Sequence, residues 1–460
     1  MMASRHTRSL LRQVSTTARP LQHQTPPPAG IPPLSILPLS AVVRTLAITT
    51  ISSSPVLLNT ALRGLDKLLQ RERNADPFGG LLRRTLYAQF CAGETPEEVG
   101  RTVAQLKQLG FAGVILGYAR EAETVADTGT KDTARAAREI REWADGTLKT
   151  VDLAGDGDMV ALKLTGAGQA VVEHLLRRST DGQAPPPPEL EEALAEICER
   201  AGERNVRLLV DAEHDAVQKA IDEWVLRLQR QYNNRDQGPI SKPRALVYGT
   251  YQAYRKSTPE VLARHLAAAQ SEGFVLGVKL VRGAYLGSDP RHLFWETKQG
   301  TDEAYDAIAA ALITGDYSKF RSFLPAQLPE MGNNALRVDL VLATHNRQSV
   351  RNARALRNQQ AQAGRPLIEM AYAQLQGMAD DLSCELVKEA KAARSGGPGQ
   401  EIPKPYKYLV WGSVNECTRY LVRRAQENRD AACRTEDSRQ AMLEELKRRI
   451  GAAVKGRSQA

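Results

Sequence analysis

Eight short apolar runs, separated by segments long enough for a helix, constrain the fold of this chain more than any other feature. Most runs are rich in Val, Ile or Leu without strict alternation, which is typical of parallel strands buried on both faces. Eight strand–helix units predict an α/β fold, a (βα)8 barrel of the TIM type with an N-terminal helical arm. The runs span 111–117, 159–164, 206–210, 245–248, 274–280, 338–343, 367–373 and 407–411.

The length of 460 residues would indicate two or three domains unless one of them is a large barrel. We expect a transit peptide and proline-rich disordered segment at 1–38, a helical arm at 39–94, the catalytic barrel at 95–430 and a helical tail at 431–460. Thr95, Pro96 and Glu98 supply an N-cap, a first-turn proline and a capping-box glutamate for a helix that reaches about Leu109. Segments inserted between repeats are expected at 183–189, 324–334 and 395–403.

The basic charge of the chain is concentrated at its N-terminus. Six arginines and no acidic residue precede Asp66, so without that stretch the net charge falls from +9 to +3. Arg5, Arg8 and Arg12 share one helical face, and Ser and Thr are frequent, which is the composition of a mitochondrial transit peptide. A disordered basic tail is the alternative. The remaining charge is too small for a polyanion-binding surface, so we expect no nucleic-acid partner.

Composition excludes several other classes of protein. With 42% hydrophobic and 25% charged residues, neither wholesale disorder nor a many-pass membrane protein fits. The most apolar segment, 39–58, contains Arg44 and many Ser and Thr, which predicts a packed amphipathic arm rather than a membrane span. Five widely spaced cysteines without a C-x-x-C pair argue against a disulfide framework, a zinc finger or a thioredoxin site.

Polar side chains follow the apolar runs, where a barrel places its active site. Lys163 and Lys279 stand among apolar residues, where burying them requires a ligand or an ion-pair partner such as Glu121, Asp211 or Glu213. We interpret both lysines as functional. The other polar residues at these positions are Thr165, Gln252, Arg282, Thr344, His345, Asn346, Gln374 and Tyr408, with Arg423 and Arg424 in the last helix.

Two familiar sites are excluded by spacing. Gly166-Ala-Gly168 resembles a dinucleotide fingerprint, but the third glycine is absent and a proline run at 185–188 replaces the expected second strand. Asp211, Glu213 and His214 have no second histidine at ligand spacing, so we expect no metal.

Six co-linear motifs resemble the proline dehydrogenase family in its eukaryotic, fungal mitochondrial form, over residues 87–428. The resemblance implies a distorted (βα)8 barrel that holds FAD without a Rossmann domain. It also implies oxidation of L-proline to pyrroline-5-carboxylate, the first step of its catabolism to glutamate. Electrons would pass to ubiquinone, with peripheral attachment to the matrix side of the inner mitochondrial membrane. The motifs are DAEH (211–214), VKLVRGAYL (278–286), TKQGTDEAY (297–305), ATHN (343–346), QLQGM (374–378) and YLVRRAQEN (420–428).

The resemblance also assigns roles to individual residues. Lys163, Arg423 and Arg424 would bind the substrate carboxylate, which suits the bidentate geometry of guanidinium groups. Tyr285 and Tyr408 would wall the ring, with Leu280 and Leu375 nearby, and Glu121 would pair with an arginine of the site. Lys163, Asp211, Tyr408, Arg423 and Arg424 form the implied catalytic set. The implied FAD contacts are Asp211, Gln252, Lys279, Val281, Arg282, Gly283, Ala284, Lys298, Thr344, His345, Asn346, Gln374 and Glu427.

The chain departs from the family pattern at three positions. Gly117 stands where many relatives carry aspartate, and Trp411 and Ser413 replace a common Tyr-Gly-Pro pattern. Tyr408 occupies a position where hydroxyproline-oxidising relatives tend to carry a smaller residue, which favours proline. The base for the ring nitrogen stays open between Asp211 and water.

Two other functions fit the same barrel. A class I aldolase would use Lys163 or Lys279 as its Schiff-base nucleophile. A binding scaffold without catalysis would have lost the carboxylate-binding residues, but Lys163, Arg423 and Arg424 are all present.

Overall fold

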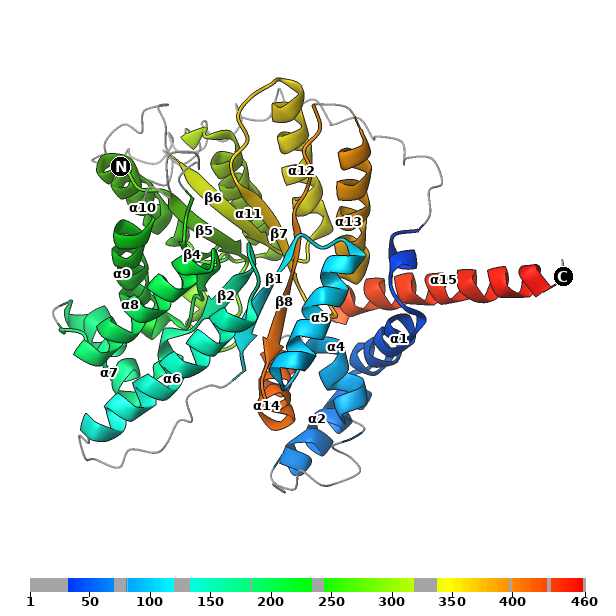
Figure 1. Ribbon diagram of the computed structural model, residues 1–460, viewed down its shortest axis with the longest axis horizontal. Coiled ribbons are helices and arrows are strands. Elements are labelled where there is room, and N and C mark those ends of the chain that lie inside the picture. Colours follow the sequence, from blue (N-terminus) through cyan, green and yellow to red (C-terminus); the bar gives the residue numbers. More distant parts are fainter. Residues whose placement is uncertain are drawn as a thin grey trace, which may run out of the picture. The chain divides into compact units, whose positions relative to one another are not determined.

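The computed structural model describes residues 32–69, 80, 82–119, 133–182, 184–233, 244–317, 337–396, 399–427 and 432–457. Within them, eight parallel strands pair in sequence order and β8 pairs with β1, which closes the barrel and confirms the predicted fold (Figure 1). The strands are β1 (Gly113–Tyr118), β2 (Met159–Leu162), β3 (Arg207–Val210), β4 (Val247–Gln252), β5 (Leu276–Val281), β6 (Val338–Ala343), β7 (Met370–Leu375) and β8 (Pro405–Trp411).

Helices separate consecutive strands and surround the barrel, as the spacing predicts (Figure 1). Two helices lie between β2 and β3, with the proline run at their junction. The helices from β1 onward are α6 (Thr133–Leu153), α7 (Gln169–Asp181), α8 (Pro188–Glu203), α9 (Asp215–Tyr232), α10 (Thr258–Glu272), α11 (Lys298–Thr314), α12 (Arg347–Gln362), α13 (Asp380–Ser395) and α14 (Val414–Glu427). Short 3-10 turns are η3 (Leu164–Ala167) and η4 (Arg291–Leu293).

The predicted strands all exist, but apolarity alone misplaces some of their ends. The sixth run matches β6 over 338–343, whereas β4 extends to Gln252, four residues beyond the predicted run 245–248. Strand β4 ends in the polar residues Thr250 and Gln252, which a search for apolar residues leaves out. The insertion expected at 324–334 lies outside the described residues.

The helix expected from Thr95 is α5 (Pro96–Leu109), and its first turn is capped from both sides. The Thr95 hydroxyl accepts a hydrogen bond from the Glu98 amide at 3.4 Å. The Glu98 carboxylate reaches back to the amide of Glu94, at 3.0 Å, rather than to the amide of Thr95. The capping residues are therefore the predicted ones, with the reciprocal bond displaced by one residue.

Strand alternation divides the core into two layers. Side chains of one parity fill the barrel interior, including Ile115, Met159, Leu209 and Val341. Side chains of the other parity pack against the surrounding helices. Successive side chains of a strand point to opposite faces. The inward-pointing residues at the carboxyl ends of the strands therefore form the candidate site.

The N-terminal arm packs against the C-terminal helix. Here α1 (Leu39–Ser53) lies beside α15 (Ala432–Arg457), and the arm continues through α2 (Pro55–Leu69), the π-helical turn η2 (Arg83–Tyr87) and α4 (Ala88–Phe90). The 3-10 turn η1 (Pro33–Ile36) precedes α1, and its Leu34 is buried against Val42, Cys384 and Met442. The described fold thus begins inside the segment that we expected to be disordered.

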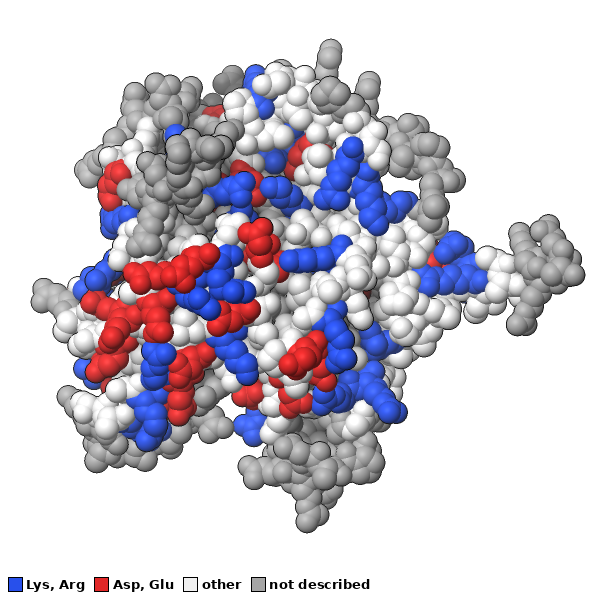
Figure 2. Space-filling view, in the orientation of Figure 1, with Lys and Arg blue, Asp and Glu red and all other residues white. Residues whose placement is uncertain are grey.

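The surface carries mixed charge. Figure 2 shows Lys and Arg interspersed with Asp and Glu on the face that it presents. Ion pairs such as Arg141 with Glu196 and Arg200 with Asp152 join α6 to α8. Within the described residues, no single helix is long and apolar enough to cross a membrane. By length and composition alone, the bent pair Leu39–Ser53 and Val56–Leu65 passes that test.

Candidate active site

An ion pair between β5 and the end of β3 stands at the centre of the candidate site. Lys279 Nζ lies 2.5 Å from Asp211 Oδ1, and both residues are buried. The Tyr408 hydroxyl donates to Asp211 Oδ2 at 3.4 Å, and Lys279 Nζ lies 5.5 Å from the centre of the Tyr408 ring. All three residues occupy inner positions of their strands, so three predicted site residues converge.

Gly117 provides the space for the Tyr408 hydroxyl. A Cβ atom on Gly117 would lie 2.9 Å from that oxygen. The departure from aspartate at this position therefore has a structural consequence, because the tyrosine of β8 fills the volume that a side chain on β1 would take.

Lys163 lies where β2 ends and η3 begins, and it faces the last barrel helix. Its Nζ is 5.9 Å from the centre of the Tyr420 ring on α14. Arg423 follows Tyr420 by three residues, almost one helical turn, and is exposed. The structure thus brings Lys163 to the helix that carries the predicted arginines. The side chains of Arg424 and Glu427, and the whole of Glu121, lie outside the described residues.

Arg282 is the centre of a second polar cluster beyond β5. Its guanidinium donates to Asp302 Oδ1 at 3.0 and 2.8 Å, to the Thr344 hydroxyl at 2.5 Å and to the Ser349 hydroxyl at 2.9 Å. Lys298 pairs with the same aspartate, and Asn346 donates to it at 3.4 Å. Three predicted cofactor residues, Arg282, Lys298 and Asn346, therefore meet around one carboxylate, and a fourth, Thr344, binds Arg282.

Asp302 is a site residue that our sequence reasoning missed. Burial alone would raise the pKa of its carboxyl, but the hydrogen bonds from Lys298 and Arg282 outweigh that effect and lower it. The spacing of Lys298 and Asp302, four residues apart at the start of a predicted helix, was the available signal.

The ends of β6 and β7 form the third part of the site. His345 Nε2 accepts a hydrogen bond from the Leu375 amide at 3.1 Å, which requires that nitrogen to be unprotonated. Buried Gln374 donates to the Thr344 carbonyl at 3.2 Å and accepts from Ser383 at 3.1 Å. Buried Gln252, at the end of β4, donates to the Glu213 carbonyl at 3.3 Å.

The loop after β5 carries Gly283, Ala284 and Tyr285 over the barrel rim. Gly283 has a φ of +136°, and a Cβ atom there would lie 2.0 Å from the ring of Tyr254, so this position requires glycine. The Tyr254 hydroxyl accepts from the Tyr285 amide at 3.1 Å, and the Tyr285 ring lies edge-on to His214.

Leu280 is a predicted site residue that the structure turns away from the barrel interior. It has no exposed surface and belongs to the outer apolar cluster between β5 and the helices. The reason is strand alternation, which turns Lys279 and Val281 toward the interior and Leu280 away from it. The expectation that Leu280 borders the substrate was therefore wrong for this structure.

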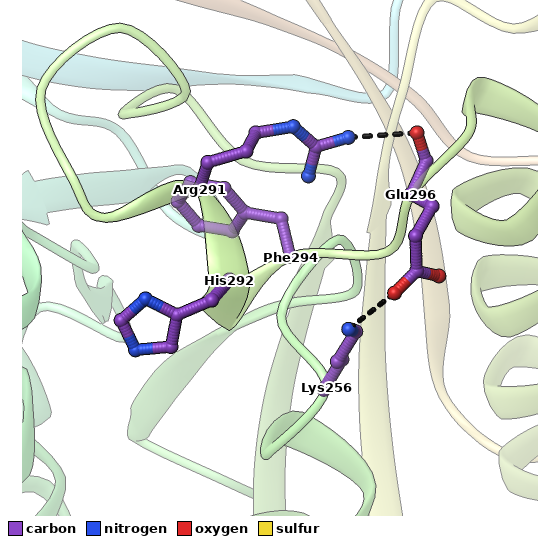
Figure 3. A pocket seen from close by; sticks show the side chains of 5 residues that line it. All are labelled: Lys256, Arg291, His292, Phe294 and Glu296. Atoms are coloured by element: carbon purple, nitrogen blue, oxygen red, sulfur yellow. Dashed lines mark hydrogen bonds and ion pairs between the residues drawn. The ribbon is translucent and has the colours of Figure 1, made fainter.

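A hollow of about 460 Å³ lies beside the loop after β5 that carries Gly283 and Tyr285 (Figure 3). Lys256 and Glu296 form an ion pair at 2.5 Å across it, and Arg291 donates to the carbonyls of Trp295 and Glu296. Phe294 lines the hollow and stacks on Tyr254 at 4.3 Å between ring centroids. The hollow therefore adjoins the residue that supports Gly283 and Tyr285.

The donor set suits a flavin better than a metal. Lys279 supplies a buried positive charge on the inner face, and Arg282, Asn346 and Gln252 supply hydrogen-bond donors at three strand ends, whereas the side chain of Gln374 turns outward to Ser383 on α13. Such groups can bind the phosphates and ring carbonyls of a dinucleotide. Among the described residues, no three His, Cys, Asp or Glu side chains could hold a metal ion.

Comparisons with known proteins show which family the chain resembles. A family model described as proline dehydrogenase matches residues 99–437. A probable mitochondrial proline dehydrogenase of Schizosaccharomyces pombe is 29% identical over 412 residues, which cover 80% of each chain. A hydroxyproline dehydrogenase of Bos taurus is 29% identical over 445 residues, which cover 89% of this chain and 90% of the relative.

Solved structures support the fold. Proline utilization A from Bdellovibrio bacteriovorus, in a structure described as inactivated by N-propargylglycine, superposes with a TM-score of 0.59 at 15% identity. The match covers 85% of this chain but 38% of the bacterial protein, so this chain spans little more than a third of that protein's length.

Proposed function

Because the chain belongs to the proline dehydrogenase family, we propose that it oxidises L-proline to pyrroline-5-carboxylate with FAD and passes the electrons to ubiquinone. The observation that carries this proposal is the convergence of Lys279, Asp211 and Tyr408 on the inner face of the barrel, with Lys163 at the neighbouring strand end. This oxidation requires cations that bind the substrate carboxylate. It also requires a buried positive charge beside the reacting ring.

The residues divide the work between binding and orientation. Lys163 and Arg423 hold the substrate carboxylate through charge-assisted hydrogen bonds, as the resemblance implies also for Arg424. Tyr408 and Tyr285 border the proline ring and exclude water from it. Flavin chemistry, when FAD is bound, supplies the acceptor for the hydride from the ring carbon next to nitrogen. Gln252, Lys279, Arg282 and Asn346 would hold the cofactor.

The ring nitrogen must lose a proton before hydride transfer, because hydride transfer from the ammonium form of proline is strongly disfavoured. Both carboxylate oxygens of Asp211 already accept a hydrogen bond, one from Lys279 and one from Tyr408. We therefore assign the proton to solvent and assign Asp211 to holding Lys279 in place.

Hydroxyproline is the second candidate substrate, because hydroxyproline dehydrogenases of several vertebrates match this chain at 28–30% identity. Tyr408 favours proline, since its ring and hydroxyl fill the space toward Gly117 and Asp211. We expect kcat/KM to be higher for L-proline than for trans-4-hydroxy-L-proline. The reverse ratio would make hydroxyproline the substrate.

A visible spectrum tests the proposal directly. The purified protein should show flavin bands that bleach when L-proline is added without oxygen. Addition of NAD should change nothing, because the chain lacks a dinucleotide fingerprint. A colourless protein whose lysine is trapped by borohydride with an aldol substrate would instead establish the aldolase function.

We also propose that the N-terminal arm attaches the enzyme to the matrix side of the inner mitochondrial membrane, where ubiquinone dissolves. Large apolar side chains are exposed along this arm: Leu39, Val43, Ile51, Val56 and Leu57. Apolar side chains exposed on an amphipathic helix bind the interface of a bilayer. Co-sedimentation with vesicles that contain anionic lipid should fall when Val43 and Val56 are changed to serine.

A further inference from the structure

Glu213 is a buried carboxylate that the reaction described above does not use. It lies two residues after Asp211, in the loop between β3 and α9, and only 4% of its surface is exposed. One carboxylate oxygen accepts a hydrogen bond from the Thr165 amide at 3.1 Å, and the other accepts one from the Thr165 hydroxyl. Both oxygens therefore bind the same residue of the neighbouring loop.

The backbone of Glu213 is fixed from two other elements. Its amide donates to the side chain of Gln218 on α9 at 2.7 Å, and its carbonyl accepts from Gln252 on β4 at 3.3 Å. The carboxylate of Glu213 is consequently held on a rigid support. A residue that is itself held rigidly can fix the position of another residue.

Thr165 belongs to the turn that carries Lys163. Lys163 directly follows β2 and precedes η3, its carbonyl accepts from the Gly166 amide at 3.2 Å, and Thr165 lies within η3. The bonds from Thr165 to Glu213 thus fix the turn two residues beyond the lysine. Burial raises the pKa of Glu213, whereas the bonds from Thr165 and the charge of Lys163 oppose that rise.

We propose that Glu213 is a positioning residue that, through Thr165, sets the place of Lys163 for the substrate carboxylate. This inference rests on the proposed function, because it assumes that Lys163 binds a carboxylate. No bond to substrate is formed or broken by Glu213.

The test compares the binding of a ligand that carries a carboxylate with the binding of a ligand that lacks one. The holoenzyme is titrated with tetrahydrofuran-2-carboxylate, which has a ring and a carboxylate, and with pyrrolidine, which has the ring and amine alone. Glu213→Gln cannot accept from both Thr165 donors. It should raise the dissociation constant of the carboxylate ligand about tenfold, equivalent to about 1.4 kcal/mol, and leave that of pyrrolidine unchanged.

Two further variants keep the test decisive if Glu213→Gln does not fold. Thr165→Val removes the hydroxyl and should give the same selective loss. Thr165→Ser keeps a hydroxyl and should bind both ligands as the unchanged protein does. Glu223→Gln removes a half-buried carboxylate on α9 that pairs with Arg178 and should not change the dissociation constant of either ligand. An equal loss for both ligands, or no loss, would overturn the inference.

The outcome for the proposed function is read separately. If L-proline fails to bleach the flavin of the unchanged protein, the proposed function is wrong. If bleaching is normal and Glu213→Gln keeps the KM for proline, only the positioning role is wrong.

Discussion

Gly117 and Tyr408 share one volume at the carboxyl end of the barrel: a Cβ atom on the glycine would lie 2.9 Å from the tyrosine hydroxyl. That distance is shorter than real Cβ contacts allow, so any side chain on β1 at this position must displace the tyrosine of β8. The tyrosine in turn donates to Asp211, which pairs with Lys279. A single missing side chain therefore determines how the centre of the site is arranged.

Gly117→Ala should accordingly lower kcat/KM for proline about tenfold, since a displacement of about 1 Å can have larger effects than this. Gly100→Ala is the matched control, because nothing lies within 4 Å of a Cβ atom there. Steady-state kinetics at equal flavin content measures the difference. Unchanged kinetics would show that Tyr408 moves without consequence.

Lys279→Met and Asp211→Asn should each destabilise the fold by about 3–5 kcal/mol, because each leaves the other charge buried without its partner. The double variant should lose less than the two single losses added together. Lys256→Met is the control, since its partner Glu296 is largely exposed and such pairs contribute at most about 1 kcal/mol. Denaturant unfolding measures the unchanged protein and the four variants, and additive losses would contradict a direct pairing.

Arg423→Met should lower kcat/KM for proline by about tenfold to a hundredfold, which corresponds to a charge-assisted hydrogen bond of about 1.5–3 kcal/mol. Flavin content should not change, because this residue addresses the substrate. Arg419→Met, one turn earlier on α14 and also exposed, is the control. Wild-type kcat/KM in Arg423→Met would return this arginine to the solvated helix surface.

His265 should make the fold sensitive to acid. It is buried beside the hydroxyl of Tyr251, and burial lowers its pKa from 6.5 to about 4. Between those values the unfolded chain binds the proton and the folded chain does not, so stability present above pH 6.5 is lost as the pH falls toward 4. The loss from this group is at most about 3 kcal/mol.

His265→Gln tests this dependence. The difference in free energy of unfolding between the unchanged protein and the variant should shrink from pH 7 to pH 4. The carboxyl of Asp222, whose pKa burial raises to about 7, titrates in both proteins and cancels in the comparison. A difference that does not vary with pH would contradict the assignment.

Residues 1–38 should direct a fluorescent reporter to mitochondria, because this segment has arginines and no acidic residue. Changing Arg5, Arg8 and Arg12 to glutamine should leave the reporter in the cytosol. Microscopy of both fusions gives the result, and a cytosolic unchanged fusion would favour the basic-tail alternative.

The number and order of the strands could be predicted from the sequence because burial on both faces leaves a local signature, a continuous apolar run. The same reasoning located Lys279, Asp211 and Tyr408, since polar residues next to such runs are conspicuous. The roles of all these site residues stay predictions, and for Glu121, Arg424 and Glu427 the structure does not describe the side chains.

Only the tertiary structure decided which of these side chains meet. Leu280 is adjacent to Lys279 in sequence yet faces the opposite layer, and Glu213 binds Thr165 across 48 residues of chain. Asp302 gathers Arg282, Lys298 and Asn346 from three different elements. The reason is physical: apolarity is a property of each segment, whereas a hydrogen bond between loops depends on how closing the barrel brings distant strand ends to one rim.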